Sequence, residues 1–245
     1  MFSAGFGFAD KRDEKPYTEN TIQRVASISK TLIGLALLKA QEMGKLNIDD
    51  PINKYLPFDV RNPQFPDDPI TIRQLATHTS TISDPQAYNK TFTLFKEPKE
   101  LGNYPSEIME KFQNPSDSLS LSVFLKSLLT EDGNWYKPTN FLNTKPGTAV
   151  EYSNLGADLA ALIVELATGE PYNNFTKQFF IEKAGMTSSG WQTNDLDRAN
   201  ISTLYATVDQ DYPEYYEITY PDGGLITSAN DLANYLIELM NGYDG

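Results

Sequence analysis

Two long apolar stretches dominate the pattern of hydrophobic and polar positions along the chain. The first spans residues 24–44, contains the apolar run 32–38, and ends at Gly44, which suits a left-handed helix cap. The second spans residues 154–168, with apolar positions three to four residues apart, and ends at Gly169. Both stretches are predicted to be helices, and the first is expected to be buried on most of its surface. Their apolar runs are too short to span a bilayer, so no transmembrane helix is expected.

Shorter elements are predicted around these two helices. Alternating aromatic and small residues predict a strand over residues 2–8. Thr71 is expected to cap a short helix, and a capping box that begins at Ser228 is expected to open a final helix over residues 229–241. The glycine pair at 223–224 has two interpretations, a plain tight turn or a close backbone approach at the floor of a cleft.

The composition excludes several kinds of function. A formal net charge of −13 argues against a nucleic-acid partner, because binding a phosphate backbone needs a concentrated basic surface. The chain has no cysteine and only one histidine, which excludes thiol catalysis, disulfides and multi-histidine metal sites. Its 245 residues, 40% of them hydrophobic, can bury a large core as one domain or as two interleaved ones.

Ser27 and Lys30 are the first candidates for chemistry. They are three residues apart at the start of the first predicted helix, so their side chains project from the same face and can meet. A serine hydroxyl becomes a good nucleophile when a neighbouring base takes its proton, and lysine replaces histidine in some serine enzymes. The bland interpretation is that Ser27 only caps the helix and Lys30 is solvated.

Tyr152 and Asn154 are the second pair of candidates, at the start of the second long helix. A tyrosine there can hydrogen-bond Ser27 and relay its proton, and an asparagine amide can hold Lys30 and a substrate carbonyl. The alternative is that Asn154 is only a helix cap. A second Tyr-x-Asn, at residues 172–174, is assigned to packing or capping because it follows a helix break.

His78 is the only residue that could complete a serine–histidine–aspartate triad. It lies near the end of the short helix that Thr71 is expected to cap. A histidine in such a position usually hydrogen-bonds backbone, and no accompanying motif marks it as a base. Both interpretations stay open at this point.

Four stretches follow one another in a fixed order and carry a family resemblance. They are V-A-S-I-S-K-T (25–31), T-I-R-Q-L-A-T-H-T-S (71–80), K-P-G-T-A-V-E-Y-S-N-L-G-A (145–157) and G-G-L-I-T-S-A-N-D-L (223–232). Together they resemble the serine β-lactamase-related family, which includes class C β-lactamases, D-alanyl-D-alanine carboxypeptidases and related esterases. The likeness covers nearly the whole chain, and four ordered stretches are far more specific than one motif.

The resemblance implies an α/β (α+β) fold of the β-lactamase/transpeptidase type. An antiparallel sheet flanked by helices would be joined to a mostly helical lobe, with the site between them. In this chain, residues 1–70 would form the α/β lobe with the nucleophile helix. Residues 71–200 would form the helical lobe that carries the tyrosine motif, and residues 201–245 would return to the α/β lobe as part of one interleaved catalytic unit.

The resemblance also implies a role for each candidate residue. Ser27 would be the acylated nucleophile, Lys30 its activating partner, Tyr152 the general base and acid, and Asn154 a ligand of substrate and lysine. The activity implied is a serine hydrolase that cleaves an amide or ester, such as a β-lactam, a D-alanyl peptide or a carboxylic ester. The substrate would be a small molecule or a peptide, and no metal or organic cofactor is expected. The sequence leaves the oligomeric state open.

The sequence departs from the family pattern in three respects. It has no K-[ST]-G or H-x-G, the family's third motif, and Thr81 stands where the family usually has glycine. The family's C-terminal strands should follow a helix like 229–241, so we expect the chain to be a fragment, truncated at its C-terminus. The alternative to a hydrolase is therefore a non-catalytic binding or structural member, or an inactive fragment. The resemblance favours a periplasmic or extracytoplasmic location, although no signal peptide is visible.

Overall fold

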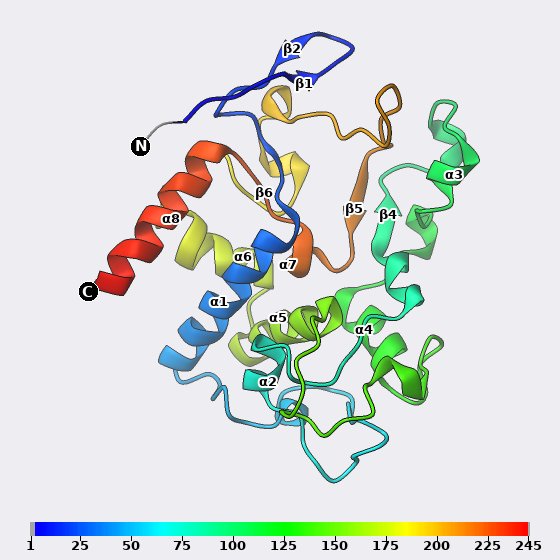
Figure 1. The fold of residues 1–245 in the computed structure, drawn as a ribbon, viewed down its shortest axis with the longest axis vertical. Helices are drawn as coiled ribbons and strands as arrows, with labels where there is room; N and C mark the ends of the chain where they lie inside the picture. Colours follow the sequence, from blue (N-terminus) through cyan, green and yellow to red (C-terminus); the bar gives the residue numbers. More distant parts are fainter. Residues whose placement is uncertain (1–2, 245) are drawn as a thin grey trace.

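The computed structural model describes residues 3–244, which form helices packed against short antiparallel strand pairs (Figure 1). The strands are β1 (Phe8–Asp10), β2 (Lys15–Pro16), β3 (Gln23–Arg24), β4 (Phe92–Leu94), β5 (Tyr215–Glu217) and β6 (Ile226–Thr227). The α-helices are α1 (Lys30–Glu42), α2 (Ile72–Ala76), α3 (Ser106–Met109), α4 (Leu121–Leu129), α5 (Asn154–Thr168), α6 (Tyr172–Thr176), α7 (Tyr220–Gly223) and α8 (Ala229–Asp244).

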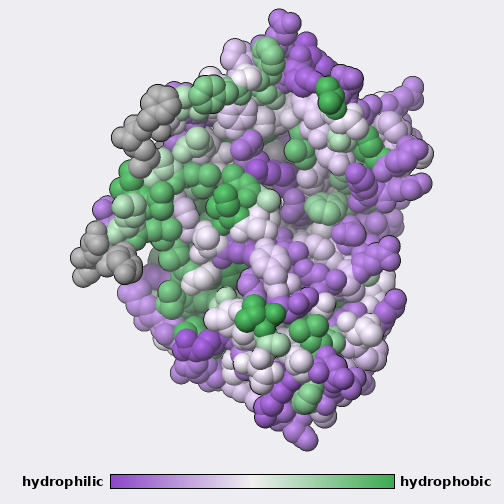
Figure 2. Space-filling model, viewed as in Figure 1, coloured by the Kyte–Doolittle hydropathy of each residue, from purple (hydrophilic) through white to green (hydrophobic). Residues whose placement is uncertain are grey.

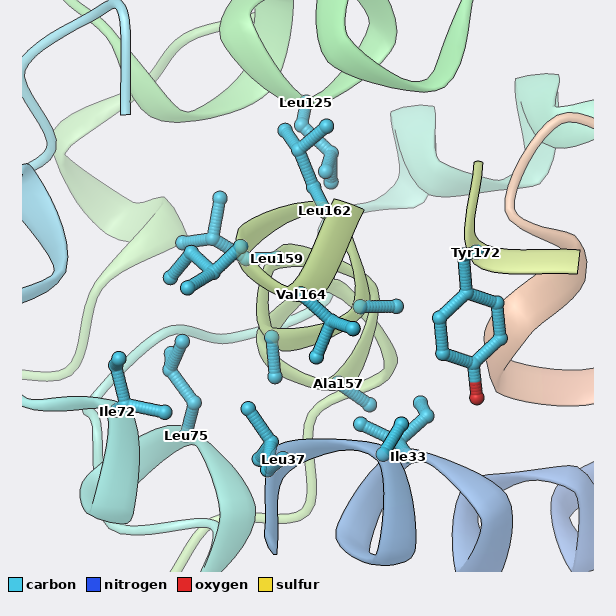
Figure 3. Close-up of a cluster of buried hydrophobic side chains, with 14 of the residues drawn as sticks. Ile33, Leu37, Ile72, Leu75, Leu125, Ala157, Leu159, Leu162, Val164 and Tyr172 are labelled. Carbon is cyan, nitrogen blue, oxygen red and sulfur yellow. The ribbon is translucent and has the colours of Figure 1, made fainter. Parts of the chain in front are cut away.

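Helix α5 is the centre of the hydrophobic core. It packs against α1, α2, α4, α6 and α7, and residues 155–164 along it are all buried. Figure 3 shows its Leu159 and Leu162 surrounded by Leu125 of α4, Leu75 of α2 and Leu37 of α1. Burying a leucine side chain contributes about 1.5–3 kcal/mol. The core therefore fixes the position of α5 relative to α1, the two helices that carry the candidate residues.

The structure confirms most of the helices that the sequence predicts. The backbone φ of Gly44 is +68° and that of Gly169 is +75°, so both glycines end their helices in the left-handed conformation. Thr71 caps α2 through a complete capping box with Gln74. The box at Ser228 forms only in part: its hydroxyl accepts from the Asp231 N–H, while the Asp231 carboxylate binds the 188–189 segment instead.

The predicted strand over residues 2–8 is wrong in its position. Residue 2 lies outside the described residues, and the strand begins only at Phe8, where β1 pairs with β2. Gly7 has a φ of +76°, which is a turn conformation rather than an extended one, and this interrupts the alternation of aromatic and small residues.

The described strands form three antiparallel pairs, and two of them join distant parts of the chain. Strand β3, just before the candidate serine, pairs with β6, and β4 pairs with β5 across more than a hundred residues. The mixture of helices and antiparallel strands agrees with the expected fold class. The division of the chain at residues 70 and 200 stays a prediction.

On the face shown in Figure 2, the largest apolar region lies on the side of α8, and smaller apolar patches are scattered among hydrophilic side chains. Leu236, Ile237, Leu239 and Met240 of α8 are each more than a third exposed. Among residues 3–244, no helix combines the length and hydrophobicity that a membrane crossing requires.

Candidate active site

Ser27 lies at a sharp turn between β3 and α1. A short 3-10 turn, Ala26–Ser29, leads directly into α1, so Ser27 lies at the N-terminal end of the helical segment. Ala26 has a φ of +47°, a left-handed conformation that costs a residue with a Cβ about 1–2 kcal/mol. This turn leaves the Ser27 side chain exposed to solvent. Strain at such a position is common where a reactive side chain must be presented.

Two of the predicted residues converge on the hydroxyl oxygen of a third. The hydroxyl of Tyr152 is 2.8 Å from Ser27 Oγ, and the Nζ of Lys30 is 3.2 Å from the same atom. Lys30 Nζ also lies 5.1 Å from the centre of the Tyr152 ring. The structure thus brings together a hydroxyl, an amine and a phenol, although 125 residues separate Ser27 from Tyr152.

Helix α7 fixes the lysine. Lys30 Nζ donates a second hydrogen bond, of 2.8 Å, to the backbone carbonyl of Asp222. A Cβ at Gly224 would lie 2.8–2.9 Å from Tyr220, which is too close, whereas one at Gly223 would make only ordinary contacts, 3.4 Å from the Glu217 carboxylate and 3.9 Å from the Ala26 backbone. The structure therefore supports a tight turn at Gly224, and a close backbone approach at the floor of a cleft stays a prediction.

His78 fixes the tyrosine rather than acting on the serine. Its ring lies 4.6 Å from the Tyr152 ring, and its Nδ1 accepts a 3.2 Å hydrogen bond from the Ser153 N–H. Within residues 3–244 it makes no hydrogen bond to Ser27, so the structure does not support the triad interpretation. Burial, together with the positive charge of Lys30, lowers the pKa of His78, and a neutral ring suits an Nδ1 that accepts.

The N-terminus of α5 is capped from two directions. Ser153 Oγ accepts from the Gly156 N–H at 2.9 Å, and the Asp84 carboxylate accepts from the N–H groups of Asn154 and Leu155 at 2.9 and 3.0 Å. Ser153, not Asn154, is therefore the helix cap. In the part of the chain that the structure describes, the Asn154 side chain makes no hydrogen bond to Lys30, and its role as a ligand stays a prediction.

Sequence reasoning missed two residues that support this site. Asp84 caps a helix about 70 residues away, and Asp222 supplies the carbonyl that holds Lys30 from 192 residues away. Neither contact has a local sequence signal, because both depend on how distant segments pack. Across residues 3–244 no group of three or more histidine or acidic side chains is arranged to hold a metal ion.

The arrangement suits nucleophilic chemistry at Ser27. A proton on Ser27 Oγ can pass to a neutral lysine amine or to a tyrosine phenolate, because both lie within hydrogen-bond distance. The N-terminal end of the helical segment places backbone N–H groups and the positive end of the helix dipole next to the hydroxyl. These features favour negative charge on an oxygen of a bound carbonyl group.

Comparison with known proteins defines the class. The family model described as Beta-lactamase matches residues 1–244, so the chain belongs to the Beta-lactamase family. The chain is 24% identical to Protein flp of Staphylococcus aureus (strain MRSA252) over 98% of its own length, and it covers 43% of that relative. It therefore spans less than half the length of this relative.

Solved structures share the fold. The octameric penicillin-binding protein homologue from Pyrococcus abyssi superposes with a TM-score of 0.69 at 26% identity, covering 96% of this chain and 48% of the other. A class C β-lactamase superposes with a TM-score of 0.63 at 24% identity, covering 94% and 54%. The predicted family and the predicted β-lactamase/transpeptidase-like fold are confirmed.

Proposed function

We propose that this protein is a serine hydrolase that cleaves an amide or ester bond through an acyl-enzyme on Ser27. The observation that carries the proposal is the convergence of Lys30 Nζ and Tyr152 Oη on Ser27 Oγ, at 3.2 and 2.8 Å. Membership of the Beta-lactamase family supports the same reaction class.

In the proposed reaction, Ser27 Oγ attacks the carbonyl carbon while its proton passes to Tyr152 or Lys30. The tetrahedral intermediate collapses when the bond to the leaving group breaks, and the leaving group takes up that proton. Water then attacks the acyl-enzyme while the same base accepts a proton from it, and the base returns this proton to Ser27 Oγ as the acyl–oxygen bond breaks and the acid product leaves. Asn154, at the start of α5, would bind the substrate carbonyl region.

The substrate is proposed to be a small molecule or a peptide. β-Lactams, D-alanyl peptides and carboxylic esters are the candidate substrate classes, in keeping with membership of the Beta-lactamase family.

Labelling by a fluorophosphonate probe tests the nucleophile. We expect covalent labelling of Ser27, none in Ser27→Ala, and unchanged labelling in Ser106→Ala, a matched control on an exposed serine. Tyr152→Phe keeps the ring against His78 but removes the hydroxyl, so the labelling rate should fall about 10²–10⁴-fold, the usual contribution of a general base. Intact mass spectrometry and peptide mapping identify the modified residue.

The same mass measurement with a penicillin in place of the fluorophosphonate separates a hydrolase from a non-catalytic binder. A binder would retain the penicillin reversibly, with no gain in mass, and Ser27→Ala would behave like the wild type. That result would overturn the proposal. Turnover of a chromogenic cephalosporin, a D-alanyl dipeptide and a p-nitrophenyl ester then ranks the substrate classes.

A further inference from the structure

Helix α5 buries one charged residue in the middle of the core. Asp158 is 0% exposed, and residues 155–164 around it are buried as well. Among residues 3–244 no hydroxyl, amide or cation donates a conventional hydrogen bond to either of its carboxyl oxygens. An ionised carboxylate in such a place is strongly disfavoured, because burial removes its hydration and nothing replaces it.

The polar neighbour of Asp158 is a second buried acid, Asp222 of α7. Asp222 is 3% exposed, and helix α7, which carries it, packs directly against α5. Two carboxylates can only accept, so a hydrogen bond between them requires a proton on one of them. The Tyr88 hydroxyl donates to Asp222 Oδ2, so Asp222 has a donor of its own and Asp158 does not.

The charges around the pair fit one proton and one negative charge. Lys30 Nζ donates to the backbone carbonyl of Asp222 at 2.8 Å, whereas Arg24 is engaged with Glu217 at 3.0 Å. The titratable groups on the surrounding elements are Lys30, Asp84, Tyr88, Tyr172, Glu217 and Tyr220. A single carboxylate balances the Lys30 ammonium, and a second would leave a buried charge without a partner.

We propose that Asp158 remains protonated and donates a hydrogen bond to the Asp222 carboxylate, and that this pair positions α7, whose Asp222 carbonyl holds Lys30 beside Ser27. The carboxyl pair links the central helix to the turn that carries this carbonyl. Burial, followed by the neighbouring Asp222, raises the pKa of Asp158 well above its usual range, in agreement with this geometry. The functional part of the inference rests on the proposed hydrolase activity.

Unfolding as a function of pH tests the proton on Asp158. A group that keeps its proton only in the folded protein makes its full contribution to stability below its pKa in the unfolded chain, about 3.9. This contribution is lost as the pH rises toward the pKa of the group in the folded protein. The unfolding constant of the wild type, divided by that of Asp158→Asn, should therefore rise about tenfold for each pH unit above pH 4. The exposed Glu238→Gln supplies the baseline. A ratio that stays constant from pH 4 to 8 would overturn the proposal.

Labelling of Ser27 tests the positioning role. Asp158→Ala removes the donor, and a displacement of Lys30 by about 1 Å should lower the labelling rate by about tenfold or more. Asp158→Asn keeps a donor and should restore the rate to within about threefold of the wild type. The double variant Asp158→Asn/Asp222→Asn removes the negative charge that balances Lys30, so the pH profile of labelling should move to lower pH.

These outcomes separate the two ideas. Failure of asparagine to restore the rate, or an unmoved pH profile in the double variant, would overturn the positioning role. If the wild type is not labelled at all, the hydrolase proposal fails, while the dependence of unfolding on pH still decides whether Asp158 carries the proton.

Discussion

Glu217 gives the structure a quantitative test, because its carboxyl group is buried next to the candidate site. Its side chain is 10% exposed and lies 3.0 Å from the Arg24 guanidinium. Burial raises the pKa of Glu217 to about 7 from its ordinary value of 4.5, and Arg24 offsets only part of this rise. A difference of 2.5 pH units, from 4.5 to 7, corresponds to about 3.4 kcal/mol at 1.36 kcal/mol per unit.

The sign of the effect follows from proton linkage. The folded protein holds a proton on Glu217 that the unfolded chain releases near pH 4.5, so the contribution to stability is complete below that pH. It is lost as pH rises from 4.5 to about 7. Glu217→Gln cannot titrate, so the free energy of unfolding of the wild type should fall relative to that of the variant by about 3 kcal/mol across this window.

Urea unfolding at half-unit steps from pH 4 to 8 measures this difference. Glu214→Gln is the matched control, because its side chain is 67% exposed and lies on the same segment. It should follow the wild type to within about 0.5 kcal/mol, as surface substitutions usually do. If the difference between Glu217→Gln and the wild type stays constant across the window, Arg24 keeps Glu217 ionised and the reasoning about burial is wrong.

Two further predictions concern the backbone beneath Ser27, and urea unfolding measures both. Ala26→Gly removes the strain of a left-handed alanine and should stabilise the protein by about 0.5 kcal/mol. The control Ala167→Gly, in a regular helix, should cost about 1 kcal/mol. Equal losses of stability in the two variants would show that residue 26 is unstrained. Gly224→Ala places a Cβ against the Tyr220 backbone and should cost about 1–3 kcal/mol, whereas Gly34→Ala, with open space around it, should gain about 0.5–1 kcal/mol. A tolerated Gly224→Ala would contradict the close packing of α7.

The sequence predicted the elements whose determinants are local. Helix α5 follows from a regular spacing of apolar residues, and its end follows from one glycine, Gly169. Helix α2 follows from the capping box at Thr71. Such signals lie within a few residues of the feature that they specify, so a pattern along the chain is enough to detect them.

The supports of the site depend on long-range contacts, and the sequence could not predict them. Thr81 shows the difference. The family resemblance marks it as a departure from glycine, and the structure keeps it at a φ of +71°, the conformation that favours glycine. Its hydroxyl accepts a 2.9 Å hydrogen bond from the Asn62 amide, 19 residues away. That buried contact offsets part of the backbone strain, and no local pattern identifies the partner.

The same distinction explains how the candidate site is built. The motifs specify which chemical groups are present, a hydroxyl, an amine and a phenol, but the amine and the phenol are held by residues outside their own motifs. His78 holds the phenol, the Asp222 carbonyl holds the amine, and Asp84 caps the helix that follows the phenol. Each of these supports joins a motif to a different segment, so displacement of one segment shifts the group that it holds. Substitutions at the supports should therefore affect the geometry at Ser27 without removing any reacting atom.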